Sequence, residues 1–376
     1  MIGVDKARIK ATKLKIDFDQ LKVNILKMFN LKGDIKAVNG EKFYIGDQEN
    51  INEKFKYINY LKITRKYPYC SLEIEFNYSR FFRRTNFELT TIQRDKETVD
   101  FNILLILSEL TEMKIEKLKY NYSNLEVTEQ LKIKKFTDFN NVICLLYKAL
   151  YNSPEFKIKG KTYLDFSSIF KTFYTTGFTV NFKNELSGLI LSTYNKSLEN
   201  NDKNDLIADK VKETALRSEF KFTQTNLKTI FGTSSVESLS LDILRNKISV
   251  GIGQAIKQAV IIQLRKDLEE IEKRLDSLDK LTPKNIELFV TENNEWILDY
   301  DLFNCILKKK LIKKRSRAVI FTYRKVAKEK LIDLENSNSP KRNNSKNVKR
   351  LQQYLKNLFG IEIEIILKEN GEIQVF

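Results

Sequence analysis

Apolar and polar residues alternate over several short stretches of this chain, a pattern typical of strands that present one face to a core. The alternation predicts strands over residues 10–18, 60–65, 71–78, 189–196 and 216–222. In the last two stretches, mainly apolar residues occupy one face, while the other face carries tyrosine and charged residues. We therefore expect these two strands to pair, with one face in the core and the other carrying reactive side chains.

Turn signals join some of these strands into hairpins. Asn39-Gly40 lies in the middle of residues 36–45 and is a dipeptide that a type I′ turn favours. A second hairpin is predicted around residues 66–69, and a third over residues 115–133 with its turn at Ser123-Asn124. The turns therefore predict an antiparallel sheet.

Apolar residues at helical spacing separate and follow these strands. Helices are predicted over residues 21–29, 99–112, 140–151, 235–245, 251–280, 285–310 and 317–334, and the chain ends in a predicted helix and hairpin, 348–359 and 361–376. The predicted fold class is α+β. An antiparallel-sheet domain with flanking helices is expected over residues 1–235, followed by a mainly helical, basic domain over residues 236–376.

The net charge of +17 over 376 residues favours a polyanionic partner such as nucleic acid. An AT-rich genome would also enrich the chain in lysine, and a charge run can simply be a solvated surface. Clustering of the cations favours nucleic acid over either alternative. The candidate DNA-binding residues are Lys308, Lys309, Lys310, Lys313, Lys314, Arg315 and Arg317.

The residue types that are rare or missing narrow the possible chemistry. Three widely spaced cysteines argue against a disulfide framework or a zinc site and fit a reducing cytoplasm. The chain has no histidine, which excludes Ser-His-Asp and Cys-His catalysis, so a bound metal would need carboxylate ligands. Because the chain has neither a long apolar run nor a signal peptide, we expect a cytoplasmic protein without a membrane partner.

Two short motifs stand on the last two predicted strands. They read Tyr-Asn-Lys-Ser-Leu-Glu over residues 194–199 and Leu-Arg-Ser-Glu over residues 216–219. Upstream, residues 71–76 and 84–87 read Ser-Leu-Glu-Ile-Glu-Phe and Arg-Thr-Asn-Phe. In order and spacing these motifs resemble those of rolling-circle replication initiators, the Rep proteins of small plasmids and the filamentous-phage gene II family. The resemblance covers roughly residues 60–235 and supports the expectation of an origin-nicking domain.

The resemblance implies that Tyr194 attacks a DNA phosphodiester, which leaves a 5′-phosphotyrosyl link and a free 3′-OH that can prime a polymerase. Lys196 and Arg217 would favour the phenolate and stabilise the charge that develops on the phosphate. Tyr163 and Tyr174 are rival nucleophiles, because the chain has 16 tyrosines and strands favour this residue.

The family also places an acidic residue on the strand that covers residues 125–133. Here the matching residue is Glu129 or Glu126. Together with Glu219 and Glu199, Glu129 would hold Mg²⁺ or Mn²⁺, since hard cations prefer oxygen ligands. The plain alternative for Glu219 is a cross-strand ion pair with Arg217.

The expected function is that of a plasmid or phage replication initiator, a metal-dependent, site-specific DNA nickase and strand transferase. Its partners would be single- and double-stranded origin DNA and a host helicase, and a leucine seam in residues 251–280 can either form a homodimer or pack within its own domain. The alternative is a non-enzymatic protein that recognises an origin or operator. The missing histidines are compatible with this alternative, because they can mark a decayed active site. An RNA-binding protein is the weakest reading, because no RNP-type or Gly-x-x-Gly motif is present.

Overall fold

The computed structural model divides the chain into two compact units. The first comprises residues 1–130, 183–193 and 217–248, and the second residues 131–182, 194–216 and 249–376. The residues that the structure describes are 2–31, 36–37, 40–45, 52–82, 88–133, 136–158, 179–184, 189–195 and 214–277, with short pieces at 282, 284–285, 353–354, 356–357, 365–367 and 373–375. The predicted boundary after residue 235 falls inside the last segment of the first unit, and most of the predicted helical domain lies outside the described residues.

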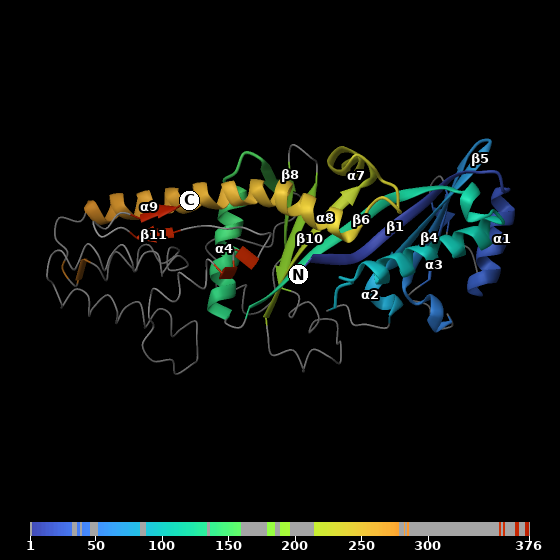
Figure 1. Cartoon of the computed structure of the whole chain (residues 1–376), viewed down its shortest axis with the longest axis horizontal. Coiled ribbons are helices and arrows are strands. Elements are labelled where there is room, and N and C mark those ends of the chain that lie inside the picture. Colours follow the sequence, from blue (N-terminus) through green and yellow to red (C-terminus); the bar gives the residue numbers. More distant parts are fainter. Residues whose placement is uncertain are drawn as a thin grey trace. The chain divides into compact units, whose positions relative to one another are not determined.

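The first unit is built on an antiparallel sheet with helices, as the α+β prediction expected (Figure 1). The strands that lie wholly or mostly in this unit are ordered β2 (Lys36–Ala37), β3 (Gly40–Tyr44), β4 (Ile58–Lys66), β5 (Tyr69–Asn77), β1 (Ile2–Leu14), β6 (Lys119–Ile133), β10 (Thr214–Thr223) and β9 (Ile190–Asn195). Each neighbouring pair from β2 to β6 is antiparallel. The hairpins predicted around residues 36–45 and 66–69 are confirmed.

Helices α1 (Phe18–Phe29), α2 (Tyr78–Phe81) and α3 (Gln93–Thr111) cover one face of these strands (Figure 1). Helix α1 begins where it does because the Asp17 side chain accepts hydrogen bonds from the backbone amides of Asp19 and Gln20. The strand predicted over residues 10–18 corresponds to β1, which starts earlier, at Ile2, and stops at Leu14, before this cap. The buried side chains between sheet and helices include Ile9, Leu61, Ile74, Leu21, Ile25, Val99 and Ile103.

The hairpin predicted over residues 115–133 is wrong. A short 3₁₀ turn, η2 (Ile115–Lys117), precedes one continuous strand, β6. The pairing with β1 shifts at Ser123, because Ile9 lies opposite Tyr122 whereas Arg8 lies opposite Asn124. The Ser-Asn dipeptide therefore forms a β-bulge within the strand instead of a turn.

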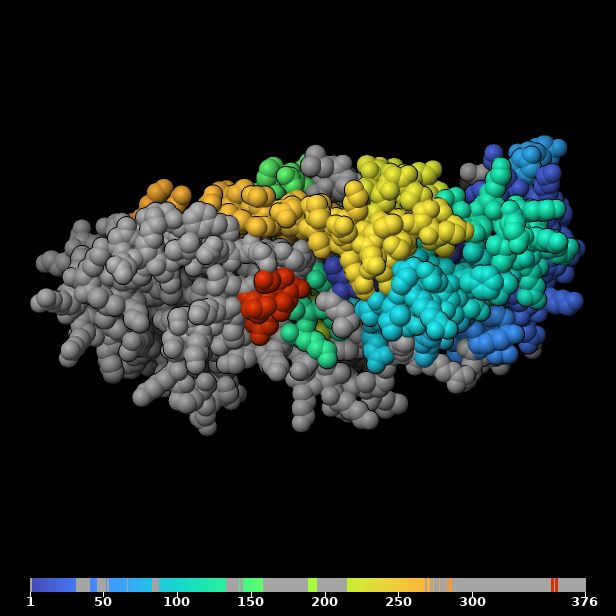
Figure 2. Space-filling model, viewed as in Figure 1, coloured from blue at the N-terminus to red at the C-terminus, as the bar shows by residue number. Residues whose placement is uncertain are grey.

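Helices α7 (Gln224–Phe231) and α8 (Leu241–Lys247) complete the first unit. The predicted helix over 235–245 begins only at Leu241, because the Ser240 hydroxyl caps it by accepting the amide of Ile243. The Leu241 amide donates to Gln93 Oε1 at 2.8 Å, which joins α8 to the start of α3. Figure 2 shows the two helices as adjoining yellow and cyan surfaces.

In the second unit, helix α4 (Phe136–Tyr151) packs on helix α9 (Gly253–Asp276), which follows a π-helical turn, η4 (Ile248–Ile252). Asn152 Nδ2 donates to Gln263 Oε1 at 2.7 Å across this contact. The remaining described strands are β7 (Phe156–Ile158), β8 (Thr179–Asn184), β11 (Ile365–Leu367) and β12 (Ile373–Val375), and pairing of the last two confirms the predicted terminal hairpin. Among the helices that the structure describes, none is sufficiently long and apolar to cross a bilayer.

Candidate functional site

The two motif-bearing strands, β9 and β10, are neighbours in the sheet, as predicted. The hydroxyl oxygens of Thr193 on β9 and Ser218 on β10 lie 3.2 Å apart, so these two residues share one face. Residues on the opposite face of β10 are also buried, and Arg217 has an exposed fraction of 0%. The strand pair therefore buries polar as well as apolar side chains.

Arg217 connects three strands. Its Nε and Nη2 donate to Gln130 Oε1 on β6, at 3.2 and 2.8 Å, and its Nη1 lies 3.4 Å from Asp5 Oδ2 on β1. Asp5 sits where the β1–β6 pairing shifts between Val4 and Lys6, and it also accepts a hydrogen bond from Asn77 Nδ2 at 3.2 Å. The guanidinium group is therefore held in position by charged and amide groups from neighbouring strands.

A carboxylate pair lies beside this arginine. Glu219 forms an ion pair with Lys221 at 3.3 Å, and Glu126 on β6 lies opposite Lys6 on β1. The pKa of Glu126 is raised to about 7, mainly by burial and next by the negative charge of Glu219. Asp5 also contributes to the rise, while Lys221 and Lys6 oppose it. A group that titrates near neutral pH inside a charged cluster is a signature of functional sites.

We refer to these side chains as the β10 cluster, which comprises Asp5, Glu126, Gln130, Arg217, Glu219 and Lys221. The structure brings together two of the predicted site residues, Arg217 and Glu219. It adds three that the sequence analysis did not select, Asp5, Gln130 and Lys221. Asp5 could have been noticed in the sequence, because it occupies the same alternating set of positions as the apolar residues Ala7, Ile9 and Ala11.

The two candidates for the acidic residue on β6, Glu126 and Glu129, lie on opposite faces of the strand. Alternation along this strand puts Glu129 on the same face as Leu125 and Val127, and Glu126 on the opposite one. Glu129 is buried, and Glu126 is the residue that belongs to the β10 cluster. Within the described residues, no three or more acidic or cysteine side chains form a group that could hold a metal ion.

Tyr194 is the last buried residue described on β9, with an exposed fraction of 8%, and it belongs to the second unit. All six residues of the β10 cluster belong to the first unit. The other predicted site residues lie outside the described part of the chain: Lys196, Glu199, Lys308, Lys309, Lys310, Lys313, Lys314, Arg315, Arg317 and the rival nucleophiles Tyr163 and Tyr174.

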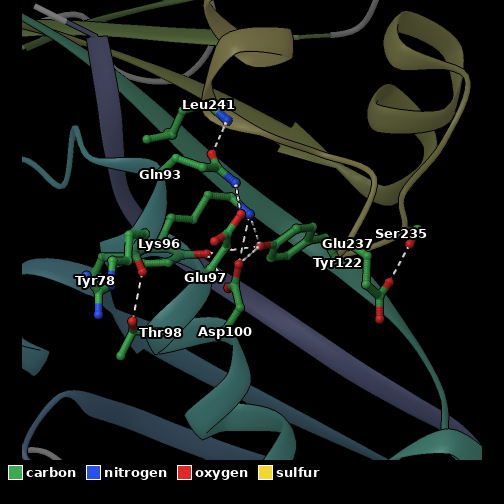
Figure 3. A network of polar contacts seen from close by, with 11 residues as sticks. Tyr78, Gln93, Lys96, Glu97, Thr98, Asp100, Tyr122, Ser235, Glu237 and Leu241 are labelled. Atoms are coloured by element: carbon green, nitrogen blue, oxygen red, sulfur yellow. Dashed lines mark hydrogen bonds and ion pairs between the residues drawn. The ribbon is translucent and has the colours of Figure 1, made fainter.

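A second polar network lies in the core between α3, β6 and α2 (Figure 3). Lys96 Nζ donates to Asp100 Oδ2 at 2.8 Å and to the Tyr122 hydroxyl at 3.0 Å. The hydroxyls of Tyr122 and Tyr78 each donate to Asp100 at 2.7 Å. All four side chains are buried, and burial raises the pKa of Asp100 even though Lys96 opposes the shift. Because every member has partners and none reaches the surface, this network holds the fold together.

Comparison of the chain with known protein families, curated proteins and solved structures found no match. The functional proposals below therefore depend on the motifs and on the geometry of the β10 cluster.

Proposed function

We propose that this protein initiates rolling-circle replication by nicking origin DNA through a tyrosine. The observation that carries the proposal is the β10 cluster, in which Arg217 and Glu219 of the Leu-Arg-x-Glu motif are buried beside Glu126 and Asp5. Burying several charges costs more than apolar packing of the same volume, so such clusters are seldom explained by stability alone. They are common where a reaction needs preorganised charge.

In the proposed reaction the Tyr194 oxygen forms a bond to phosphorus and the P–O3′ bond breaks. The 3′ oxygen leaves and takes up a proton, which gives the free 3′-OH, while the 5′ phosphate stays on the tyrosine. Arg217, fixed by Asp5 and Gln130, would offer its positive charge to the phosphate as negative charge develops. Lys196, two residues after Tyr194, is the second proposed cation.

The carboxylates of the β10 cluster fit a hard divalent cation, Mg²⁺ or Mn²⁺. Burial is the main cause of the raised pKa of Glu126 and the charge of Glu219 is the next, and a bound cation would oppose both effects. Mg²⁺ is commonly held by one or two carboxylates together with substrate phosphate and water, so the pair is a sufficient protein contribution. When bound, the cation would polarise the scissile phosphate. In this proposal Glu126 takes the place that the sequence analysis gave to Glu129.

The proposal is tested with supercoiled plasmid that carries the DNA surrounding the protein's own gene. We expect relaxed, nicked circles in the presence of Mg²⁺ or Mn²⁺ and none after addition of EDTA. Mass spectrometry of the trapped complex should find the nucleotide on the peptide that contains Tyr194, and Tyr194→Phe should bind the DNA without cutting it. An adduct on Tyr163 or Tyr174 would reassign the nucleophile.

A second candidate function is a non-enzymatic initiator or regulator that binds origin or operator DNA and recruits a host helicase. Two observations favour it: the described part of the chain contains no group of three possible metal ligands, and Tyr194 is buried. This candidate predicts site-specific binding of the same DNA with no nicking at any divalent metal concentration. Either protein would act in the cytoplasm on single- and double-stranded origin DNA, and either can form a homodimer.

A further inference from the structure

The face of the first unit's sheet opposite α1 and α3 carries a surface that the nicking proposal does not use. Helix α3 contacts the face of β6 that bears Tyr122, through Lys96. Tyr122 lies opposite Ile9, so Lys10 and Arg8, its neighbours on β1, point to the other face. Side chains of β3, β4 and β5 join them there.

Two cross-strand rows make up this surface. In the first row Lys42, Lys62, Glu73 and Lys10 lie directly opposite one another on β3, β4, β5 and β1. In the second row, two residues along, Tyr44, Tyr60, Glu75 and Arg8 do the same. We call the eight residues the tyrosine–lysine face. It spans four strands, or about 14 Å at a strand spacing of about 4.8 Å.

The first row is strained electrostatically. Like charges directly opposite each other on neighbouring strands are destabilising, and Lys42 lies opposite Lys62. The only acidic residue of the row, Glu73, accepts hydrogen bonds from the hydroxyls of Ser123 at 2.7 Å and Tyr60 at 3.4 Å. Among the described residues neither Lys10 nor Lys62 forms an ion pair. The row therefore has an excess of positive charge that an anion would neutralise.

The second row supplies aromatic rings beside that charge. Tyr44 is 43% exposed and packs edge-on against Tyr60. Lys42 Nζ lies 4.5 Å from the ring centre of Tyr44 and 3.8 Å from that of Tyr60, and Arg8 lies 5.5 Å from the Tyr60 ring centre. In the same row the Glu75 carboxylate is neutralised by Lys6 and Arg8. The face thus offers one partly exposed aromatic ring, that of Tyr44, next to three lysines.

We infer that the tyrosine–lysine face binds single-stranded DNA, with a base stacked on Tyr44 and the adjoining phosphates on Lys42, Lys62 and Lys10. Stacking needs an unpaired base with an open face, and phosphates supply the anions that the lysine row lacks. An acidic protein surface would offer carboxylates to the lysines, whereas a single nucleic-acid strand offers a flat base and its phosphates side by side. The inference deepens the proposed function, because it gives the strand that is nicked a second place of contact.

The test measures binding of a labelled oligothymidylate in EDTA by the Tyr194→Phe protein, so that neither nicking nor an origin sequence contributes. Changing Lys10, Lys42 and Lys62 together to glutamine should reduce the slope of log affinity against log salt by about two, since each phosphate contact on a single strand contributes about 0.7. The matched control changes three exposed cations elsewhere in the first unit, Arg94, Lys114 and Lys117, to glutamine, and should leave the slope unchanged.

Tyr44→Ala should weaken binding by about fivefold or more without changing the salt slope, because stacking of one base contributes at least about 1 kcal/mol. Tyr44→Trp should bind about as tightly as the wild type, because it keeps an aromatic ring. If any change of Tyr44 simply disrupted the fold, Tyr44→Trp would bind as weakly as Tyr44→Ala. Phe101→Ala, at an exposed aromatic on the helical side, is the control and should bind normally. The same substitutions should weaken binding of an oligouridylate, since base planes and phosphates are common to RNA and DNA. Tyr44→Ala should not change the affinity for duplex DNA.

The inference would be overturned if the variants of the tyrosine–lysine face and the control variants lost the same affinity, or if the triple lysine variant kept the wild-type salt slope. So would duplex DNA that binds as tightly as the single strand and loses the same affinity with Tyr44→Ala. Failure of the proposed nicking reaction is recognised separately, by the absence of a tyrosine adduct, and leaves this binding measurement unaffected.

Discussion

Arg217 on β10 reaches Asp5 on β1 across the intervening strand β6, with Nη1 3.4 Å from Oδ2. The two residues are 212 positions apart in the chain. The arginine side chain is fully buried, and Gln130 of the strand between them accepts two further hydrogen bonds from it. This contact makes β1, β6 and β10 depend on one another.

Replacing Arg217 should therefore destabilise the protein strongly. We expect Arg217→Met to lower the free energy of unfolding by about 3–5 kcal/mol, because it leaves Asp5 buried without its cation. Urea unfolding followed by circular dichroism measures the change. The added substitution Asp5→Leu should recover part of the loss, and Lys221→Met, at a more exposed ion pair, should cost no more than about 1 kcal/mol. A small loss with Arg217→Met would show that the contact adds little to stability.

Glu126 should make stability fall as pH rises through the neutral range. Its pKa is raised to about 7 in the folded protein, against about 4.3 for an unfolded glutamate, so between these values the folded state holds a proton that the unfolded state has lost. Stability should therefore decrease from about pH 4.3 to about pH 7, by up to about 1.4 kcal/mol per pH unit from this group. Denaturant midpoints recorded in EDTA across this range, for wild type and Glu126→Gln, measure the effect.

Glu126→Gln should remove this part of the slope and raise stability above pH 7. Glu97→Gln, an exposed acid on α3, is a control that should leave the slope intact. Parallel pH profiles for the wild type and Glu126→Gln would contradict the assignment of the shifted pKa to this carboxyl.

The buried network should tolerate loss of the whole ion pair better than loss of one partner. Lys96→Met leaves Asp100 in the core without a cation, and we expect a loss of about 3–5 kcal/mol in the free energy of unfolding. The double variant Lys96→Met/Asp100→Leu should be more stable than Lys96→Met alone, although Tyr78 and Tyr122 then lose an acceptor. Thermal or urea unfolding of the two variants decides the order, and the reverse order would be inconsistent with this reasoning.

The basic segment near residue 310 lies outside the described residues, so its role remains a prediction from sequence. Neutralising Lys313, Lys314, Arg315 and Arg317 together should reduce the salt slope for duplex DNA by roughly two to four, because each phosphate that a cation neutralises adds about 0.9 to that slope. Affinity should fall alike for origin and non-origin DNA, because binding to phosphates carries no sequence information. Nicking of a short single-stranded origin oligonucleotide at low salt should survive. A variant that keeps the wild-type salt slope would indicate a merely solvated segment.

Local patterns predicted much of the sheet because they reflect forces that act within a few residues. The β2–β3 hairpin, the β4–β5 hairpin and the pairing of β9 with β10 are examples. Helix α3 begins at Gln93, earlier than predicted, because its first two turns are largely polar and carry little apolar periodicity. Helix α7 was not predicted at all, although Thr223 and Asn226 form a capping box at its start.

Other features depend on contacts between distant segments, which no local pattern contains. Ser123-Asn124 resembles a turn, yet the Ser123 hydroxyl donates to Glu73 on another strand, and the chain continues as a bulge. The sequence could not decide between Glu126 and Glu129, because the choice depends on which of the two lies on the same face of the sheet as Arg217 and Glu219, and only the pairing of β6 with β10 fixes that. Arg217 and Glu219 were selected from their motif, whereas their partners Asp5 and Gln130 became apparent only when the strands were placed side by side.

The order in which the strands are joined has a consequence for synthesis on the ribosome. Strand β6 can pair with β1 as soon as both have left the exit tunnel, but its other neighbour, β10, is translated only about eighty residues later. During that interval β6 is an edge strand whose free backbone groups can pair with another nascent chain. Slow translation between residues 133 and 214 should therefore increase co-translational aggregation, whereas slowing after residue 248, when the first unit's last segment is complete, should have little effect.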